Sequence, residues 1–395
     1  VMPLHVLHST YATVDVPQTL FVALALLAAV RIAGEGAPRD YLLAGLWAGL
    51  AASTKYGGAL VLIAPVVAHL LPARSDRTGG VALVSIWPLV SLGAALLAFV
   101  LTSPYTLLDW THARADILYE MGHMRLGEEP ARSADPSGWI FHGRNLLLTT
   151  TGLGALALLG VVGLGRRRQL RPLLGPMAFA AVWILVISQA NVRYLRYELP
   201  LTPVVALLGV GATLALWGRR PEWRLVALAL PTIAVGLGLG VSARLADALR
   251  TRPDPRDLAR DEVVRRVPPD RAVGMVWEPW FHSAPLDRCN GGQALRRNPL
   301  WARYSEPVRE LRVTGLDPGQ LRTGRPWAYV VSNFEVRDWQ RVKDRNALDF
   351  LRVLEEQYAL AAVCARPAPL DGLGGWHAPQ DWLYPFPTVE LRLRR

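Results

Sequence analysis

Long apolar segments separated by short charged turns fill roughly the first 250 residues, whereas the later residues mix apolar and charged positions. A membrane-spanning helix needs about 20 predominantly apolar residues, within a range of about 17–25. The apolar segments therefore predict an α-helical domain over residues 1–250 that crosses a membrane several times. They lie at about 16–34, 41–55, 57–72, 81–101, 146–165, 173–190, 197–217 and 225–245.

The second and third segments are short for a span, and the sequence Lys55-Tyr56-Gly57-Gly58 separates them. We interpret them as two short helices that meet at one membrane face. Glycines inside the apolar segments, as in Gly152-Leu-Gly and Gly236-Leu-Gly-Leu-Gly, predict close packing between helices.

Residues 251–395 predict a small α/β domain, because short apolar runs alternate there with segments of helical periodicity. The sequence Trp277-Glu-Pro-Trp-Phe-His either stacks on sugar rings or packs within this domain, and the residues alone leave both open. We expect strands at Ala272–Trp277, Trp327–Ser332, 359–364 and 388–393, and helices from Pro253 to the pair Pro268-Pro269 and at Asp344–Tyr358.

Arginines in the turns between apolar segments predict the membrane topology, because basic residues favour the cytoplasmic side. Two spans separate each arginine cluster from the next, so all clusters fall on one side. The clusters are Arg74/Arg77, Arg166/Arg167/Arg168/Arg171 and Arg219/Arg220/Arg224. The opposite, external face then holds Asp15, Lys55, the loop 103–145, the turn 191–197 and the C-terminal domain, which makes that domain extracytoplasmic.

The net charge of +11 changes this picture little. Much of the positive excess lies in those turns, and no nucleic-acid motif accompanies it, so we expect no nucleic-acid partner. Residues 1–15 read as the end of a loop, which leads us to expect further segments before Val1. Cys289 and Cys364 either pair or remain free thiols.

Asp15 and Lys55 lie at the edges of apolar segments, where an ionisable group usually marks a ligand, an ion or a partner. The alternative is that Asp15 caps the helix that follows it and that Lys55 extends to the membrane surface. Arg193 and Arg196 either clamp an anion or anchor the chain at the interface together with Tyr194 and Tyr197.

The loop 103–145 is too long for a simple connector, and its first half has the spacing of an amphipathic helix on the membrane surface. His112, His123 and His142 occur there without the spacing of a zinc-binding helix, so we predict no metal site.

Four motifs together resemble the membrane glycosyltransferases of family 39, which include protein O-mannosyltransferases and aminoarabinose transferase-like enzymes. The sequence His-Ser-Thr-Tyr-Ala-Thr-Val-Asp-Val-Pro at 8–17 resembles their second external loop. The others are Gly45-Leu-Trp-Ala-Gly-Leu-Ala-Ala-Ser-Thr-Lys-Tyr, Ser103-Pro-Tyr-Thr-Leu-Leu-Asp with Gly122-His123, and Arg196-Tyr-Glu-Leu-Pro-Leu-Thr-Pro.

This resemblance implies the GT-C fold, in the plasma or inner membrane, and transfer of a hexosyl or pentosyl group. The donor would be a polyprenyl-phosphate sugar, and the acceptor a protein, lipid or glycan at the external face of the cell envelope. Asp15 would orient the acceptor or sugar, or hold a divalent metal ion if one is used as cofactor. The substrate-binding candidates are Lys55, Arg193 and Arg196 for the lipid phosphate, with Tyr194, His8 and His123.

The principal carboxylate of such enzymes, the expected general base, belongs to an external loop that would precede Val1. Glu120, Glu128 and Glu129 are weak substitutes by sequence position. A second hypothesis is a membrane protein without catalysis that binds or translocates a lipid-linked glycan. It ranks lower, because no internal repeat is visible and the ionisable groups gather at one face.

Overall fold

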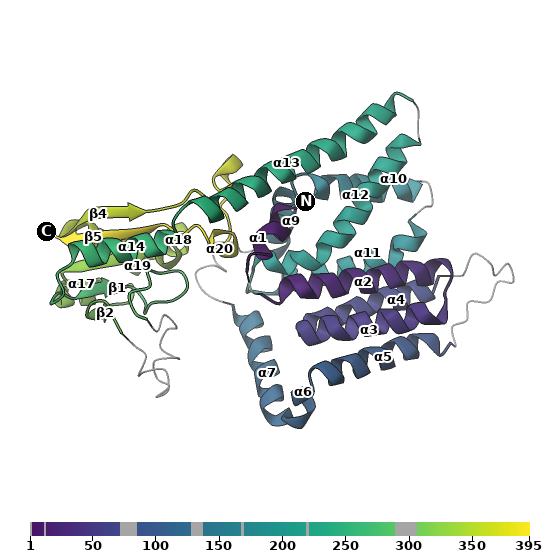
Figure 1. Cartoon of the computed structure of the whole chain (residues 1–395), viewed down its shortest axis with the longest axis horizontal. Coiled ribbons are helices and arrows are strands. Elements are labelled where there is room, and N and C mark those ends of the chain that lie inside the picture. The colour runs from purple at the N-terminus through teal and green to yellow at the C-terminus, as the bar shows by residue number, and fades with distance from the viewer. Residues whose placement is uncertain are drawn as a thin grey trace. The chain divides into compact units, whose positions relative to one another are not determined.

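The computed structural model describes residues 2–11, 13–71, 85–127, 137–166, 170–218, 221–288 and 306–395. The chain divides into two compact units, of which the first contains residues 1–127 and 137–242 and the second residues 128–136 and 243–395. The first unit is helical, and the second contains a small β-sheet (Figure 1). Cys289, Glu128, Glu129 and several of the turn arginines lie outside the described residues.

Helices, most of them apolar, make up the first unit, and the last of them, α13, extends beyond its final residue. They are α1 (Pro3–His8), α2 (Asp15–Gly34), α3 (Pro38–Thr54), η1 (Tyr56–Leu62), α4 (Ile63–His69), α5 (Trp87–Thr102), α6 (Tyr105–Leu108), α7 (Trp110–Leu126), α9 (Gly138–Thr149), α10 (Leu153–Arg166), η2 (Arg171–Leu173), α11 (Leu174–Gln189), η3 (Leu195–Leu201), α12 (Thr202–Trp217) and α13 (Trp223–Thr251).

Four helical segments within the described residues are long and apolar enough to cross a membrane. They are Asp15–Gly34, Arg171–Gln189, Leu195–Trp217 and Trp223–Arg266, and Tyr56–His69 and Trp87–Thr102 are shorter apolar helices. This arrangement fits the predicted polytopic membrane protein. The predicted break at Lys55 is also observed, because α3 ends at Thr54 and a separate helix begins at Tyr56.

Close helix approach in the first unit depends on small residues of α3, which packs against both α2 and α5. A Cβ atom at Gly45 would lie 2.1 Å from the carbonyl oxygen of Ser91, and one at Gly49 would lie 2.3 Å from that of Ala95. Only glycine allows the two backbones to come this close. Close packing was also expected at Gly152-Leu-Gly and Gly236-Leu-Gly-Leu-Gly. A Cβ at Gly154 would lie 3.2 Å from a side-chain atom of Leu147 on α9, whereas one at Gly236 or Gly240 would have no described atom within 4 Å, so the prediction fails at those two positions.

The segment predicted as one helix over 146–165 is divided by a bend of 103° between α9 and α10. Thr151 and Gly152 adopt positive φ angles of 52° and 92°, which a helix does not permit. The hydroxyl of Thr150 then accepts a hydrogen bond from the backbone N–H of Gly154, 3.0 Å away, and so stabilises the start of α10. A run of threonines before a glycine thus ends α9, which itself begins within the predicted loop 103–145.

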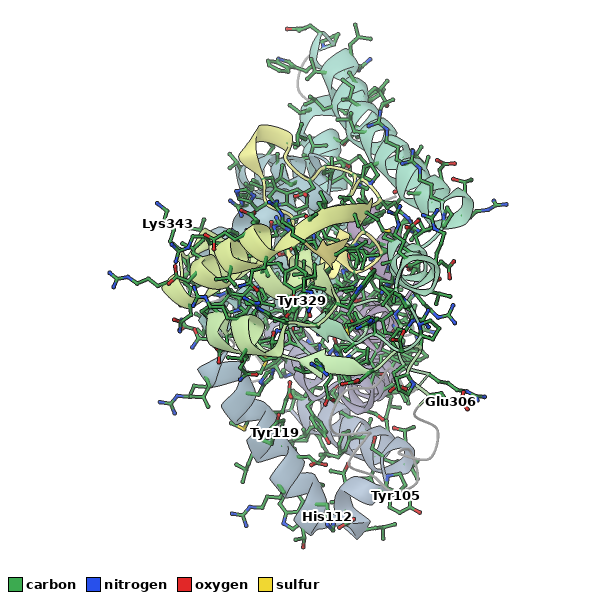
Figure 2. The ribbon with its side chains drawn as sticks, turned by 90° about the vertical axis from the view of Figure 1, so that its left-hand side faces the viewer. Tyr105, His112, Tyr119, Glu306, Tyr329 and Lys343 are labelled. Carbon is green, nitrogen blue, oxygen red and sulfur yellow. The ribbon has the colours of Figure 1, made fainter. Side chains whose placement is uncertain are left out.

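The predicted helix in that loop is present as α7, preceded by the short α6. None of its residues is buried. Figure 2 shows Tyr105, His112 and Tyr119 along this segment, and Tyr105 and Tyr119 are 75% and 74% exposed. Because α7 buries no side chain within the first unit, its position depends on contacts at its C-terminal end. Its placement on a membrane surface stays a prediction.

The second unit contains a five-stranded sheet with the order β2-β1-β3-β5-β4. Strand β1 pairs in parallel with β2 and β3, whereas β5 is antiparallel to both β3 and β4. The elements are α14 (Pro255–Arg266), β1 (Val273–Met275), β2 (Leu311–Val313), α17 (Pro318–Gly324), β3 (Ala328–Ser332), α18 (Asn333–Arg341), α19 (Arg345–Gln357), β4 (Tyr358–Cys364), η4 (Leu373–Gly375), α20 (Gln380–Leu383) and β5 (Val389–Arg394).

Both faces of this sheet are covered. Ala328 and Val330 of β3 pack in one apolar cluster with α14, and Tyr329 and Val331 pack in another with α19. Since successive side chains of a strand point to opposite faces, β3 reads as a continuous apolar run. Four predicted strands and both predicted helices are observed, and β2, α17, α18, η4 and α20 are additional. Cys364 is buried and forms no disulfide with any described residue, and Cys289, with which it could pair, lies outside them.

Candidate functional site

The side chain of Asp15 is almost fully buried at the start of α2, with 4% of its surface exposed. Val14 is the N-cap residue of α2, and no side chain caps this end of the helix. The carboxylate oxygen Oδ1 instead accepts a hydrogen bond from Nζ of Lys55 at 2.7 Å. The capping alternative for Asp15 is therefore not observed, and the charge of Asp15 is paired across the interior of the unit.

Lys55 reaches Asp15 because the chain leaves the helix at this residue. Its backbone is extended, with φ −159° and ψ 127°, between α3 and η1. The side-chain amide of Gln18 donates to the carbonyl oxygen of Lys55 at 3.2 Å, which ties this break to α2. Gly58 completes the turn, because a Cβ there would lie 2.3 Å from the carbonyl oxygen of Ala51.

Arg196 brings a second cation to the same carboxylate. Its Nε lies 3.8 Å from Oδ2 of Asp15, and its side chain is 22% exposed. The segment η3, which carries Arg196, is held in place by Trp183, whose indole N–H donates to the carbonyl oxygen of Tyr197 at 2.7 Å. Three residues far apart in sequence thus meet at one point.

Two tyrosine rings orient these cations. Nζ of Lys55 lies 4.4 Å from the ring centroid of Tyr197, and the guanidinium carbon of Arg196 lies 4.0 Å from that of Tyr194. Such cation–π contacts contribute about 0.5–2 kcal/mol each, depending on how far the cation is desolvated. Tyr194 and Tyr197 therefore restrict the conformations of the cations that a ligand would contact.

A cavity of about 490 Å³ opens beside Lys55. This volume is within the usual range of small-molecule sites, about 300–1,000 Å³. Its lining combines apolar side chains and aromatic rings with hydroxyl groups, one cation and one carboxylate. The lining residues are Ser53, Thr54, Lys55, Tyr56, Gly57, Leu60, Ser103, Glu120, Met124, Trp183, Val186, Ile187 and Tyr197.

The remaining predicted site residues, Arg193, His8 and His123, do not line this cavity. Nε of Arg193 donates to the carbonyl oxygen of Ala190 at 3.2 Å, so this nitrogen binds the backbone of its own segment. His8 is fully buried on α1, edge-on to Tyr11 at a centroid distance of 5.5 Å. His123 stacks on Tyr119 along α7. Among the described residues, no three His, Cys, Asp or Glu side chains form a group that could hold a metal ion.

Two features of the site are hard to predict from the residues alone. His142 of α9 and Glu198 of η3 are both completely buried, and Nδ1 of His142 lies 3.0 Å from Oε1 of Glu198. This contact joins α9 to η3, two residues beyond Arg196. Glu120 was judged a weak candidate, yet it lines the cavity beside Lys55. The helical periodicity of α7 places Glu120 and Met124 on one face, but only the tertiary structure shows that this face lines the cavity.

Several apolar helices and a buried carboxylate held by two cations define a polytopic membrane protein with a polar site between its helices. Residues 1–107 match the family of dolichyl-phosphate-mannose-protein mannosyltransferases. This match indicates a membrane glycosyltransferase and confirms the resemblance that the motifs within these residues suggested. Searches of curated proteins and of solved structures found no match.

Proposed function

We propose that the protein transfers a sugar from a polyprenyl-phosphate carrier to a protein, lipid or glycan acceptor at the outer face of the membrane. The observation that carries this proposal is the convergence of Lys55 and Arg196 on the buried carboxylate of Asp15, beside a cavity of suitable size.

The charges at this point favour an anionic ligand. Asp15 neutralises one of the two cations, so the group as a whole retains one positive charge. The phosphodiester of a polyprenyl-phosphate sugar carries one negative charge, which would balance it. Lys55 and Arg196 are also accessible, with 34% and 22% of their side chains exposed, whereas Asp15 is enclosed.

Lys55 and Arg196 would act in the transfer step itself. When the bond between the anomeric carbon and the phosphate oxygen breaks, negative charge develops on the departing phosphate. Cations that are already in place stabilise this charge without reorganisation, and this is usually the largest electrostatic contribution in such a site. The rings of Tyr194 and Tyr197 keep both cations in place.

The orientation in the membrane is part of the proposal. Asp15, Lys55 and η3 would face the outside, the turn arginines the cytoplasm, and residues 251–395 would form an extracytoplasmic domain that faces the acceptor. Reporter fusions after residue 250 test this arrangement directly. A fusion that reports a cytosolic position would contradict the orientation and the external transfer reaction with it.

Transfer assays with purified protein and defined polyprenyl-phosphate sugars test the activity. We expect Lys55→Ala and Arg196→Ala to lower kcat/KM by at least about 10²-fold, the usual effect of removing one charge-stabilising group. Lys55→Arg should keep part of the activity, because the charge is retained. Arg39→Ala, at the opposite end of α3, and Lys343→Ala, in the second unit, are matched controls.

Each outcome of this assay decides the proposal. Wild-type turnover in correctly folded Lys55→Ala and Arg196→Ala proteins would contradict the phosphate site. Wild-type protein that binds a polyprenyl-phosphate sugar but transfers nothing would instead be a lipid-glycan binding protein.

A further inference from the structure

Three consecutive side chains of η3 each meet a different helix. A 3-10 helix has about three residues per turn, so successive side chains point about a third of a turn apart. Arg196 faces Asp15 at the start of α2, with Nε 3.8 Å from Oδ2. The Tyr197 hydroxyl donates to a methionine of α7 at 3.6 Å, and Glu198 faces His142 of α9. Together these contacts fix how η3 is rotated about its axis.

The contact between Glu198 and His142 is the most enclosed of the three. Both side chains are completely buried, and 3.0 Å separates Oε1 of Glu198 from Nδ1 of His142. A hydrogen bond in such surroundings is electrostatically strong, and breaking it leaves a buried polar group without that partner. Arg196, in contrast, is 22% exposed. The segment is therefore held from its enclosed side and presents its cation on the accessible side.

The helix α9 is a firm support for this contact. A Cβ atom at Gly138 would lie 2.2 Å from the carbonyl oxygen of Ser188, so α9 packs directly against the backbone of α11. Phe141 and Asn145 are buried on α9 together with His142. No residue of α9 lines the cavity beside Lys55. His142 therefore acts on η3 from outside the space that a ligand would occupy.

We propose that His142 and Glu198 are positioning residues for Arg196, an inference that rests on the proposed glycosyltransferase function. Their hydrogen bond keeps η3 rotated so that the guanidinium of Arg196 stays at Asp15 and meets the lipid phosphate with its accessible side. Neither residue contacts the substrate. A displacement of about 1 Å caused by a distant substitution can cost about 10²-fold in rate, so a contact two residues from Arg196 is close enough to affect transfer.

The test compares Glu198→Ala in two backgrounds. In the otherwise unchanged protein, we expect it to lower kcat/KM by about 10–10²-fold. In an Arg196→Ala protein the same change should lower kcat/KM by less than about 3-fold further, because a residue that acts through Arg196 then has no cation to position. Glu198→Gln keeps a hydrogen-bonding group beside Nδ1 of His142 and should retain most of the activity. If Glu198→Ala does not fold, Glu198→Asp, which is shorter by one methylene, gives the same comparison.

A variant that only loses stability serves as the control. Gly45→Ala disturbs the packing of α3 against α5, because its Cβ would lie 2.1 Å from the carbonyl oxygen of Ser91. It does not change η3, so kcat/KM should stay near that of the wild type. Hydrogen exchange of residues 195–201, followed by mass spectrometry, should be faster in Glu198→Ala and unchanged in Gly45→Ala.

The outcomes separate this role from the activity itself. Equal falls in kcat/KM in the two backgrounds would show that Glu198 does not act through Arg196, and would overturn the proposal. Unchanged kcat/KM in Glu198→Ala, alongside an impaired Arg196→Ala protein, would overturn it as well and leave the transferase standing. Absence of transfer by the wild-type protein from every polyprenyl-phosphate sugar would remove the proposed function, and the positioning role with it.

Discussion

The contact between Lys55 and Asp15 should be visible as an energetic coupling between the two residues. Lys55→Met removes the cation and leaves the buried carboxylate facing only Arg196, whose Nε lies 3.8 Å away. Asp15→Asn removes the anion and keeps the shape of the side chain. The double variant removes both charges. Comparison of the three variants with the wild type isolates the interaction between the two side chains.

The structure sets the size of the expected effect. At 2.7 Å and an effective dielectric constant of about 20, the direct attraction is about 6 kcal/mol. Removal of Asp15 from water offsets much of this, and solvent screens Lys55, whose side chain is 34% exposed. We therefore expect Lys55→Met to lower the free energy of unfolding by about 3 kcal/mol and Asp15→Asn by about 1 kcal/mol. The double variant should lose only about 2 kcal/mol, which gives a coupling of about 2 kcal/mol.

Unfolding in mixed micelles of a mild detergent and dodecyl sulfate, followed by circular dichroism, measures these free energies. The wild type and the three variants must be compared in one micelle composition. A double variant whose loss equals the sum of the two single losses, within about 0.5 kcal/mol, would show that the two charges are independent. The contact would then contribute no coupling free energy, and Asp15 would not hold the cations in position.

Three further predictions concern other parts of the molecule. Gly45→Ala should destabilise the first unit by about 1–3 kcal/mol, because its Cβ would lie 2.1 Å from the carbonyl oxygen of Ser91. Gly93→Ala on α5 is the control, because a Cβ there meets open space, and it should be neutral or slightly stabilising. Unfolding in micelles compares the two variants. Glu198→Ala should destabilise the first unit by about 1–3 kcal/mol, because it removes a hydrogen-bond partner of the buried His142. Glu198→Ala combined with His142→Phe should lose less, so equal losses would argue against the pair. Burial raises the pKa of Glu335 from near 4.5 to about 7, although the N–H groups of Ser332 and Trp277 oppose this rise. Because the folded state then binds the proton more tightly, the contribution of Glu335 to the stability of the second unit should be largest below about pH 4.5 and fall by about 3 kcal/mol as the pH rises to about 7. Glu335→Gln should abolish this slope in hydrogen exchange of β3, and a slope that persists would exclude Glu335 as its source.

Local patterns in the sequence were enough to place most elements. The apolar segments predicted the spans, and the charged break at Lys55 predicted where α3 ends, because helix length and helix breakers are properties of neighbouring residues. The strands β1, β3, β4 and β5 were predicted for the same reason. The short β2 was missed, since three residues at a sheet edge carry too little pattern.

The bend between α9 and α10 shows the limit of this reasoning. Hydropathy is continuous across Thr149, Thr150 and Thr151, so the segment reads as a single span. The positive φ angles of Thr151 and Gly152, and the bond from the Thr151 hydroxyl to the carbonyl oxygen of Ala234 at 3.1 Å, depend on a neighbouring helix. Such a contact overrides the local preference and cannot be seen in the segment alone.

The sequence by itself determined that this chain enters a membrane, that Asp15 and Lys55 lie at the ends of its helices, and that motifs in its first part resemble those of lipid-dependent glycosyltransferases. Only the tertiary structure decided that the carboxylate of Asp15 is shared between Lys55 and Arg196, that Glu198 meets His142, and that Glu120 faces the cavity. Periodicity tells which face of a helix is apolar, but the partner of a charged side chain depends on how distant helices dock. The docking depends on how closely the helices can approach, as at the glycines of α3, and on the contacts at the C-terminal end of α7.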